Sequence, residues 1–238
     1  MSDSHPQTGQ PIGRAVDSRP AERPAAVRLE GRCGAVERLR PSTHAESLWE
    51  AVCGHDKLWT YMAYGPFPDE CAFSGWLASR ETLTDPYYYA VVEPSGRAVG
   101  LATLMSIRPD MRVVEVGNIL LSPPLQRTVL ATEAQYLLAG YAFETLRYRR
   151  YEWKCDALNA ASRRAALRLG FTFEGIFRDH MIIKGRSRDT AWFAMLEAEW
   201  PARKAAFERW LAPENFAADG TQKRKLGELH GSQNAKGE

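Results

Sequence analysis

The stretch LSPPLQRTVLATEA, residues 121–134, joins an apolar run to a helix start through a polar turn. The first amides of a helix have no partner within it and carry the positive end of its dipole, so they can hold a phosphate. Phosphate-binding loops usually contain glycine, because a left-handed backbone or a close ligand excludes a Cβ. This loop has none, although a valine with helical φ and ψ still donates its N–H. Alone, the stretch predicts either a phosphate site or only a turn.

Composition predicts one folded domain with appendages. The 238 residues include 45% hydrophobic and 11% aromatic residues, enough for a proper core. The four cysteines are scattered and form no C-x-x-C pair, which is typical of reduced thiols. The N-terminus has no apolar stretch of signal-peptide length, and no apolar run approaches the length of a membrane span. We therefore expect a soluble, cytoplasmic protein that does not contact a membrane.

The order of elements predicts the fold class. Residues 1–26 are polar and contain prolines, so we expect a flexible leader, and a second flexible tail over residues 214–238. Residues 27–198 form the main domain and residues 199–213 a C-terminal helix. Within the domain the order β-α-α-β-β-β-α-β-α-β-β predicts an α+β or α/β fold of three layers. Ser42 and Thr43 are expected to cap the first helix, and Asp69 begins the second.

A second constellation adds to the loop. In WKCDALNAASRRAALRLGF, residues 153–171, a strand ends at Asn159, Ser162 lies at a helix start, and Gly170-Phe171 follow that helix. With VEVGNILLSP (114–123), the loop and TEA (132–134), this order and spacing resembles the GNAT superfamily of acyl-CoA-dependent N-acetyltransferases. The likeness is greatest to the branch that acetylates N-termini of ribosomal proteins and its small-molecule relatives. It covers about residues 27–197 and implies a mixed, mostly antiparallel sheet with a splayed central strand pair.

The resemblance implies that acetyl-CoA binds at the loop as a cosubstrate. The family motif Gln/Arg-x-x-Gly-x-Gly/Ala falls on residues 126–131, where Val129 replaces the central glycine. The backbone amides from Arg127 to Thr132 would hold the pyrophosphate, with the Thr132 hydroxyl as an extra donor, and the strand end near Leu121 and Asn159 would hold the pantetheine arm. The implied cofactor-binding residues are Leu121, Gln126, Arg127, Thr128, Val129, Leu130, Ala131, Thr132, Asn159 and Arg164. Arg163, Arg164 and Arg168 are candidates for the 3′-phosphate of CoA, and Arg164 and Arg168 lie four residues apart on one side of the helix. The competing interpretation is a solvated face, which is commoner for an arginine-rich helix.

The resemblance also implies two catalytic residues, Glu115 and Ser162. An alkylammonium has a pKa of about 10, so the attacking amine must lose a proton, and Glu115 lies where the family commonly has a base. Ser162 matches a serine that protonates the leaving thiolate, and Ala166 stands where many members have a tyrosine. In the alternative interpretation Glu115 only pairs with an arginine, and Ser162 or Asn159 caps the helix.

Two aromatic segments have competing interpretations. KLWTYMAYGPF, residues 57–67, is expected to wall the acceptor cleft, with Trp59 in the core and Tyr61 or Tyr64 facing the cleft. RYRRYEWK, residues 147–154, mixes basic and aromatic residues as single-strand nucleic-acid binders do. Strand alternation sends Tyr151 and Trp153 to one face, which favours core packing.

The sequence thus predicts an acetyl-CoA-dependent N-acetyltransferase that acts by direct transfer to a primary amine in a ternary complex. The amine belongs to a small molecule or to a protein or peptide N-terminus, and the protein is a monomer or homodimer. The histidines lack metal-ligand spacing, so no metal is expected. One alternative is a non-catalytic module that binds acyl-CoA or a partner, which Val129 and Ala166 favour. Another is nucleic-acid binding through the tail QKRK (222–225); the net charge of +2 argues against it, so we expect no nucleic acid.

Overall fold

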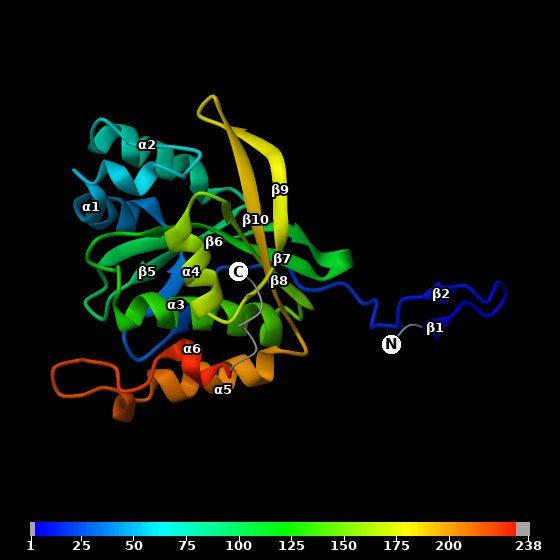
Figure 1. The fold of residues 1–238 in the computed structure, drawn as a ribbon. Helices are drawn as coiled ribbons and strands as arrows, with labels where there is room; N and C mark the ends of the chain where they lie inside the picture. Colours follow the sequence, from blue (N-terminus) through cyan, green and yellow to red (C-terminus); the bar gives the residue numbers. More distant parts are fainter. Residues whose placement is uncertain (1–2, 232–238) are drawn as a thin grey trace.

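The computed structural model describes residues 3–231, so the predictions for residues 1–2 and 232–238 lie outside the described residues (Figure 1). The strands are β1 Asp3–Ser4, β2 Pro11–Ile12, β3 Arg28–Glu30, β4 Ala35–Arg38, β5 Tyr87–Val92, β6 Ala98–Arg108, β7 Val113–Leu121, β8 Arg150–Asp156, β9 Thr172–Ile183 and β10 Arg186–Leu196. The α-helices are α1 Pro41–Val52, α2 Glu70–Glu81, α3 Val129–Gly140, α4 Ala160–Arg168, α5 Trp200–Leu211 and α6 Leu226–Leu229. Shorter helical turns are η1 Asp56–Trp59, η2 Pro109–Met111, η3 Tyr141–Thr145 and η4 Pro213–Asn215.

Eight strands form one sheet in the order β3-β4-β5-β6-β7-β8-β10-β9. Neighbours in this sheet run antiparallel except β7 and β8, which run parallel. Parallel neighbours need a crossover connection, and α3 supplies it between β7 and β8. The mixed, mostly antiparallel sheet predicted from the sequence is confirmed.

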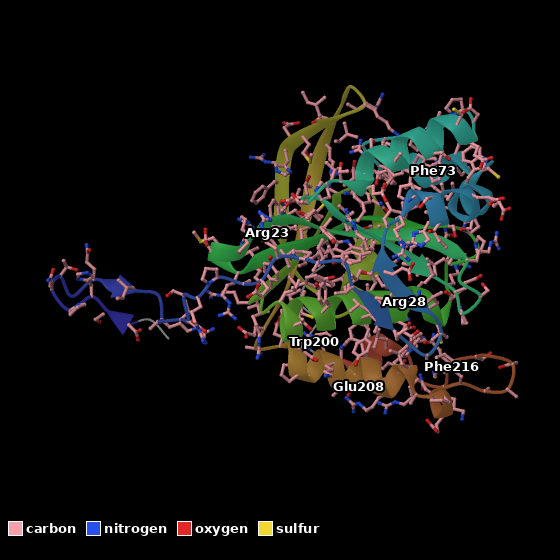
Figure 2. The ribbon with its side chains drawn as sticks, turned by 180° about the vertical axis from the view of Figure 1, so that it is seen from behind. Arg23, Arg28, Phe73, Trp200, Glu208 and Phe216 are labelled. Carbon is pink, nitrogen blue, oxygen red and sulfur yellow. The ribbon has the colours of Figure 1, made fainter. Side chains whose placement is uncertain are left out.

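Helices cover both faces of this sheet, which gives three layers (Figure 1). On one face α1 and α2 bury Leu48 and Phe73 against strand residues such as Tyr88. On the other face α3, α4 and α5 bury a larger core that includes Tyr151 and Trp200. Figure 2 shows Phe73 and Trp200 in the helices of these two different layers. Tyr151 and Trp153 are both buried, so the core interpretation of residues 147–154 holds for their aromatic members.

The helix starts agree with the sequence in one case and differ in another. Asp69 caps α2, and its carboxylate accepts the Ala72 N–H at 2.8 Å, as predicted. The first helix begins earlier than predicted, at Pro41, with Arg40 as an N-cap that makes no side-chain cap. Proline has no N–H to satisfy and its fixed φ suits the first helical position, so the hydroxyls of residues 42 and 43 are not needed there.

Both terminal segments contact the domain, although composition predicts flexibility for them. Ala21 is buried and donates its N–H to the Pro109 carbonyl at 3.1 Å. At the other end Leu226 and Leu229 are buried as α6 packs against α4 and α5. The β1–β2 hairpin lies away from the sheet (Figure 1). Some apolar residues of these polar segments therefore reach the core, whereas Ile12 and Val16 are exposed.

Glu133 joins the turn between β3 and β4 to α3. Its carboxylate is 3% exposed and accepts the N–H groups of Arg32 at 2.8 Å and Cys33 at 2.7 Å. Glu133→Ala is expected to lower the free energy of unfolding, measured by urea denaturation, by about 3 kcal/mol, because two amides lose a charged acceptor.

The matched control is Glu50→Ala, which removes an exposed carboxylate paired with Arg97. Exposed pairs contribute little, so a change below about 0.5 kcal/mol is expected. Equal losses in the two variants would show that Glu133 does not hold the turn.

Candidate active site

The site is built where β7 and β8 separate. These parallel strands are paired from Val113–Arg150 to Val116–Trp153. Beyond that point β7 continues to Leu121 against β6 alone, and β8 continues to Asp156 against β10 alone. One edge of each strand therefore offers backbone donors and acceptors to a gap between them, hereafter the strand gap.

A bend in β7 accompanies the strand gap. Asn118 has a left-handed φ of 48°, and the β6–β7 register shifts next to the Thr103–Gly117 pair. The Asn118 Nδ2 donates to the Thr103 hydroxyl at 3.3 Å. A Cβ on Gly117 would collide with the Met105 sulfur. The Gly117-Asn118 pair thus places an irregularity in β7 just beyond its last pairing with β8.

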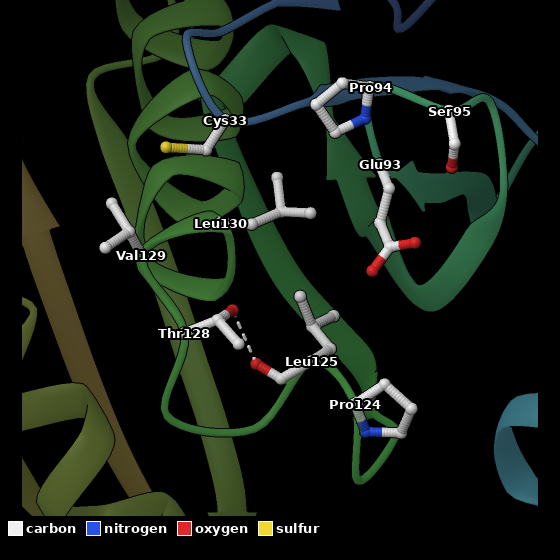
Figure 3. A pocket seen from close by; sticks show the side chains of 9 residues that line it. All are labelled: Cys33, Glu93, Pro94, Ser95, Pro124, Leu125, Thr128, Val129 and Leu130. Carbon is white, nitrogen blue, oxygen red and sulfur yellow. Dashed lines mark hydrogen bonds between the residues drawn. The ribbon is translucent and has the colours of Figure 1, made fainter. Parts of the chain in front are cut away.

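The loop after β7 is closed by its own hydrogen bonds (Figure 3). The Gln126 N–H donates to the Ser122 carbonyl at 2.9 Å, and its side-chain amide donates to the Leu121 carbonyl at 2.9 Å. The Thr128 hydroxyl donates to the Leu125 carbonyl at 2.8 Å. The Gln126 side chain is therefore occupied within the loop, and Leu121 contributes its carbonyl to the same closure.

Three amides at the start of α3 remain available. Thr128 caps the helix, because its hydroxyl accepts the Ala131 N–H at 3.1 Å. Within residues 3–231, the N–H groups of Arg127, Val129 and Leu130 have no hydrogen-bond partner. Val129 is helical, as the phosphate interpretation requires, and the left-handed conformation falls on Arg127, with φ of 63°. The set of free donors is smaller than the six-residue range expected from the sequence.

Val129 packs its side chain against the main core and is half-buried. With Leu125 and Leu130 it lines a hollow of about 440 Å³, closed on the far side by Cys33 and the β5–β6 turn at 93–95 (Figure 3). The lining of this hollow includes no residue of β7 or β8, so it is distinct from the strand gap.

Asn159 caps α4, since its Oδ1 accepts the Ser162 N–H at 3.0 Å. Of the two competing caps, the structure has Asn159. The Ser162 hydroxyl accepts the indole N–H of Trp153 at 3.0 Å. Burial raises the pKa of Cys155, and a hydrogen bond with Ser162 partly offsets that rise. Ala166 is fully buried. Because alanine has no proton to donate, this position offers no general acid.

Glu115 is buried on β7 and is paired with a cation. It is 6% exposed, and its carboxylate accepts from Lys154 Nζ at 2.9 Å and from the Ser106 hydroxyl at 3.0 Å. Glu115 is therefore a paired strand carboxylate, as in the alternative interpretation, but its partner is a lysine and not the expected arginine. Whether Glu115 also acts as a base stays a prediction.

Glu115 and Ser162 belong to opposite faces of the sheet. Trp153 and Lys154 are adjacent on β8, so their side chains point to opposite faces. Ser162 is bonded to Trp153, and Glu115 is bonded to Lys154. A group lying between the separated strands would therefore have a hydroxyl on one side and a carboxylate on the other.

Glu152 completes a buried charge network beside Lys154. It is 3% exposed and lies 2.9 Å from Lys154 Nζ, 2.7 Å from Arg150 Nε and 3.3 Å from Arg108 Nη2. Burial alone would raise the pKa of Glu152, but the hydrogen bonds from Arg150 and Lys154 hold it below its usual value. Lys154 is thus shared by two carboxylates.

The aromatic segment 57–67 reaches the strands that border the gap. Trp59 is 2% exposed within an aromatic cluster, as expected. The Tyr64 hydroxyl donates to Asn118 Oδ1, and the Tyr61 hydroxyl donates to the Leu158 carbonyl, both at 3.3 Å. Burial, followed by the neighbouring Tyr88, raises the pKa of Tyr64 well above its usual value, so Tyr64 is a neutral donor.

Thr132 and Arg164 are placed differently from what the resemblance implies. Thr132 is buried, and its hydroxyl accepts from Arg168 Nη1 at 3.0 Å. Arg164 is exposed, and its guanidinium makes no hydrogen bond or ion pair with any other described residue, as on a solvated face. Arg168 lies 5.0 Å from the Trp210 ring centroid, and burial lowers its pKa. The cation beside the first turns of α3 is therefore Arg168.

Asn118 and Lys154 are site residues that the sequence interpretation missed. A Gly-Asn pair inside an apolar strand run indicates a bulge, and this signal could have found Asn118. No local signal marks Lys154, because its partner Glu115 is 39 positions away and the contact depends on strand register.

In the part of the chain that the structure describes, no helix is long and apolar enough to cross a membrane. Nor do three His, Cys, Asp or Glu side chains of residues 3–231 gather so that they could hold a metal ion.

Known proteins share this architecture. Residues 36–172 match the acetyltransferase (GNAT) domain family. A GCN5-related N-acetyltransferase from Brucella melitensis superposes with a TM-score of 0.87 at 43% identity, covering 89% of this chain and 97% of that one. A probable GNAT-family acetyltransferase from Chromobacterium violaceum gives 0.75 at 39%, covering 81% and 100%. The "Putative ribosomal N-acetyltransferase YdaF" of Bacillus subtilis is 28% identical over 109 residues, 46% of this chain, and the chain spans only 59% of that protein's length.

Glu152→Gln is expected to lower the free energy of unfolding at pH 7 by about 3 kcal/mol, because Arg150 and Lys154 lose a buried partner. Folding lowers the pKa of Glu152, so the unfolded chain binds more protons as the pH falls through the ordinary glutamate pKa of about 4.3. The stabilisation is present above that pH and lost below it. Urea denaturation should therefore show a smaller wild-type-to-variant difference at pH 4 than at pH 7.

Glu174→Gln is the control, because Glu174 also pairs with Arg150 but is 39% exposed. Its effect at pH 7 should be well under half that of Glu152→Gln. A Glu152→Gln difference that is the same at both pH values would contradict the assignment.

Proposed function

We propose that this chain, which belongs to the GNAT acetyltransferase family, transfers an acetyl group from acetyl-CoA to a primary amine. The observation that carries the proposal is the strand gap, with Glu115 belonging to one face of the sheet and Ser162 to the other. The gap exposes the backbone edge of β7 beyond Val116. This edge suits the pantetheine arm of acetyl-CoA, because the amide groups of the arm can pair with the backbone of a strand. The free amides at the start of α3 suit a pyrophosphate.

The residues present fit the cosubstrate at the loop. Arg127, Val129 and Leu130 supply unpartnered N–H donors at the positive end of α3. The Val129 side chain packs against the core. Its Cβ therefore does not have to lie between the Val129 amide and the anion, although the family motif has glycine at this position. The hydroxyl of Thr132 is left out of this grip, because it is buried against Arg168. Arg168 in turn brings positive charge close to the same helix end.

The amine arrives as an ammonium, so its nitrogen must lose two protons on the way to an amide. One of them balances the proton taken up by the departing thiolate, and the other passes to solvent. The amine nitrogen forms a bond to the thioester carbon, and the carbon–sulfur bond breaks. Glu115 takes the first proton from the ammonium, directly or through water, and the hydrogen bond from Lys154 fixes the position of the Glu115 side chain. Ser162 can donate to the departing sulfur, whose thiol pKa of about 8.5 makes this help modest. Much of the rate comes from holding both reactants together.

The acceptor we propose is a peptide or protein N-terminus. The support is the name of the Bacillus subtilis relative, which describes a ribosomal N-acetyltransferase. Tyr61 and Tyr64 stand on the acceptor side and offer hydroxyl groups next to the strand gap. A small amine is the competing acceptor. Release of free CoA thiol, measured with peptides and with small amines, decides between the two.

Val129→Pro tests the loop, because it deletes one N–H and little else. Val129 is the first residue of α3, a position that tolerates proline, and Thr128 is extended at φ −89° and ψ 164°, as a residue before proline prefers. Loss of one donor to a phosphate should weaken acetyl-CoA binding about tenfold in calorimetric titration, the effect of about 1.4 kcal/mol.

Val129→Ala is the matched control, since it shortens the same side chain but keeps the N–H. Its affinity for acetyl-CoA should stay within about threefold of wild type, a change of well under 1 kcal/mol. Equal affinities for the proline and alanine variants would remove the amide of Val129 from the site. No binding of acetyl-CoA to wild type at millimolar concentration would remove the proposed function altogether.

Glu115→Gln tests the base. Turnover, followed as release of free CoA thiol with peptides and small amines as acceptors, should fall by about 10²–10⁴-fold, while acetyl-CoA affinity is kept. Glu144→Gln, an exposed carboxylate paired with Lys204, is the control and should leave turnover unchanged.

Full turnover in Glu115→Gln would contradict the base role. Binding of acetyl-CoA by wild type without turnover of any amine would instead support the non-catalytic module that the sequence leaves open.

A further inference from the structure

A basic cavity lies at the other end of the strands that border the gap. It measures about 1400 Å³ and is lined by residues 14–22 of the N-terminal segment, the starts of β7 and β8, and residues 196–198 at the end of β10. The strand gap opens after Val116 and Trp153, whereas this cavity is lined by Val113 and Arg150, where the same two strands begin. The two sites therefore use opposite ends of β7 and β8.

Arginine dominates the lining of this cavity. Seven arginines and three carboxylates line it, and it has no lysine. The arginines are Arg14, Arg19, Arg108, Arg112, Arg147, Arg149 and Arg150. The carboxylates are Asp17, Glu22 and Glu197. A net charge of +2 for the whole chain hides this local excess, because acidic residues elsewhere balance it.

Ion pairs account for only part of this charge. Asp17 pairs with Arg19, and Glu197 pairs with Arg112. Arg108 and Arg150 pair with Glu152, and Arg150 also pairs with Glu174; both acids lie outside the lining. Among the described residues no carboxylate lies within ion-pair distance of three of the arginines, against a single unpaired acid, Glu22. These three are Arg14, Arg147 and Arg149.

Arg112 fixes the backbone of three other arginines of the cavity, Arg147, Arg149 and Arg150. It is 9% exposed and left-handed, with φ of 52°, and its Nε donates to the Arg147 carbonyl at 2.8 Å. Its own carbonyl accepts the N–H groups of Arg149 at 2.9 Å and Arg150 at 3.2 Å. Its Nη1 donates to the Asp17 carbonyl at 3.3 Å, which fastens the N-terminal segment. The arginine side chains therefore extend from a fixed backbone.

We infer that this cavity binds the phosphodiester backbone of a nucleic-acid strand. Guanidinium groups match phosphate oxygens in a bidentate way, which an all-arginine lining favours over lysine. A strand presents a negative charge at every nucleotide, so it can meet several fixed arginines along one open cavity. The lining has no aromatic side chain, so contacts are to phosphate and sugar and carry no base preference. This inference does not depend on the acetyl-transfer proposal.

The test uses the full chain and fluorescence anisotropy with a labelled single-stranded RNA of about 20 nucleotides and the matching DNA. Binding should weaken steeply between about 50 and 200 mM salt, with a slope of about 0.7 per neutralised phosphate. The double variant Arg147→Gln/Arg149→Gln should bind about tenfold or more weakly at the lower salt and lose about 1.4 from that slope.

Arg178→Gln/Arg186→Gln is the control, because both arginines are exposed on the β9–β10 hairpin and outside the cavity lining. It should leave the affinity and the slope unchanged. Equal binding of RNA and DNA supports recognition of the backbone alone, and tighter binding of RNA supports added contacts to the 2′-hydroxyl. No binding at low salt, equal weakening by the control, or equal competition by polyglutamate would overturn the inference. The last result would point to an acidic protein segment instead.

Discussion

The short pairing of β7 with β8 is the constraint on which the site depends. The two strands share hydrogen bonds only from Val113–Arg150 to Val116–Trp153, and each then continues with its outer neighbour alone. β7 and β8 are parallel and are followed by α3 and α4, so both helices start at the same end of these two strands. The free amides at the start of α3, the Asn159 cap of α4 and the free backbone edge of β7 therefore meet at one place. A continuous β7–β8 ladder would close that place.

Buried charge is the second feature that shapes the site, and its two roles oppose each other. Lys154 joins Glu115 to Glu152 and thereby satisfies charges that would be costly alone in the core. The same ammonium also occupies one oxygen of the Glu115 carboxylate, the group that the proposed base would use. Arg150 and Arg108 share Glu152, so Lys154 does not have to neutralise both acids by itself. If Glu115 is the base, as proposed, the substrate ammonium has to reach a carboxylate that Lys154 and Ser106 already contact.

Local pattern was enough to predict the element order, the mixed sheet, the Asp69 cap and the burial of Trp59, because each follows from spacing along the chain. The choice between Asn159 and Ser162 as cap could not be made, since both residue types cap helices. Contacts made through register or tertiary packing lay beyond the sequence: Lys154 with Glu115, Arg168 with Thr132, and the arginines gathered around Arg112. Helical spacing paired Arg164 with Arg168 but could not separate them: Arg164 is exposed, whereas Arg168 contacts Thr132 of α3.

The central claim is that acetyl-CoA lies along the free edge of β7 and against the first amides of α3. Backbone amide shifts in an isotope-labelled sample, followed while acetyl-CoA is added, test this directly. The account predicts that the largest changes fall on residues 117–121, on Val129 and Leu130, and on Asn159, with little change in β3 and β4. Saturable binding with these amides unmoved and the largest changes elsewhere would contradict it.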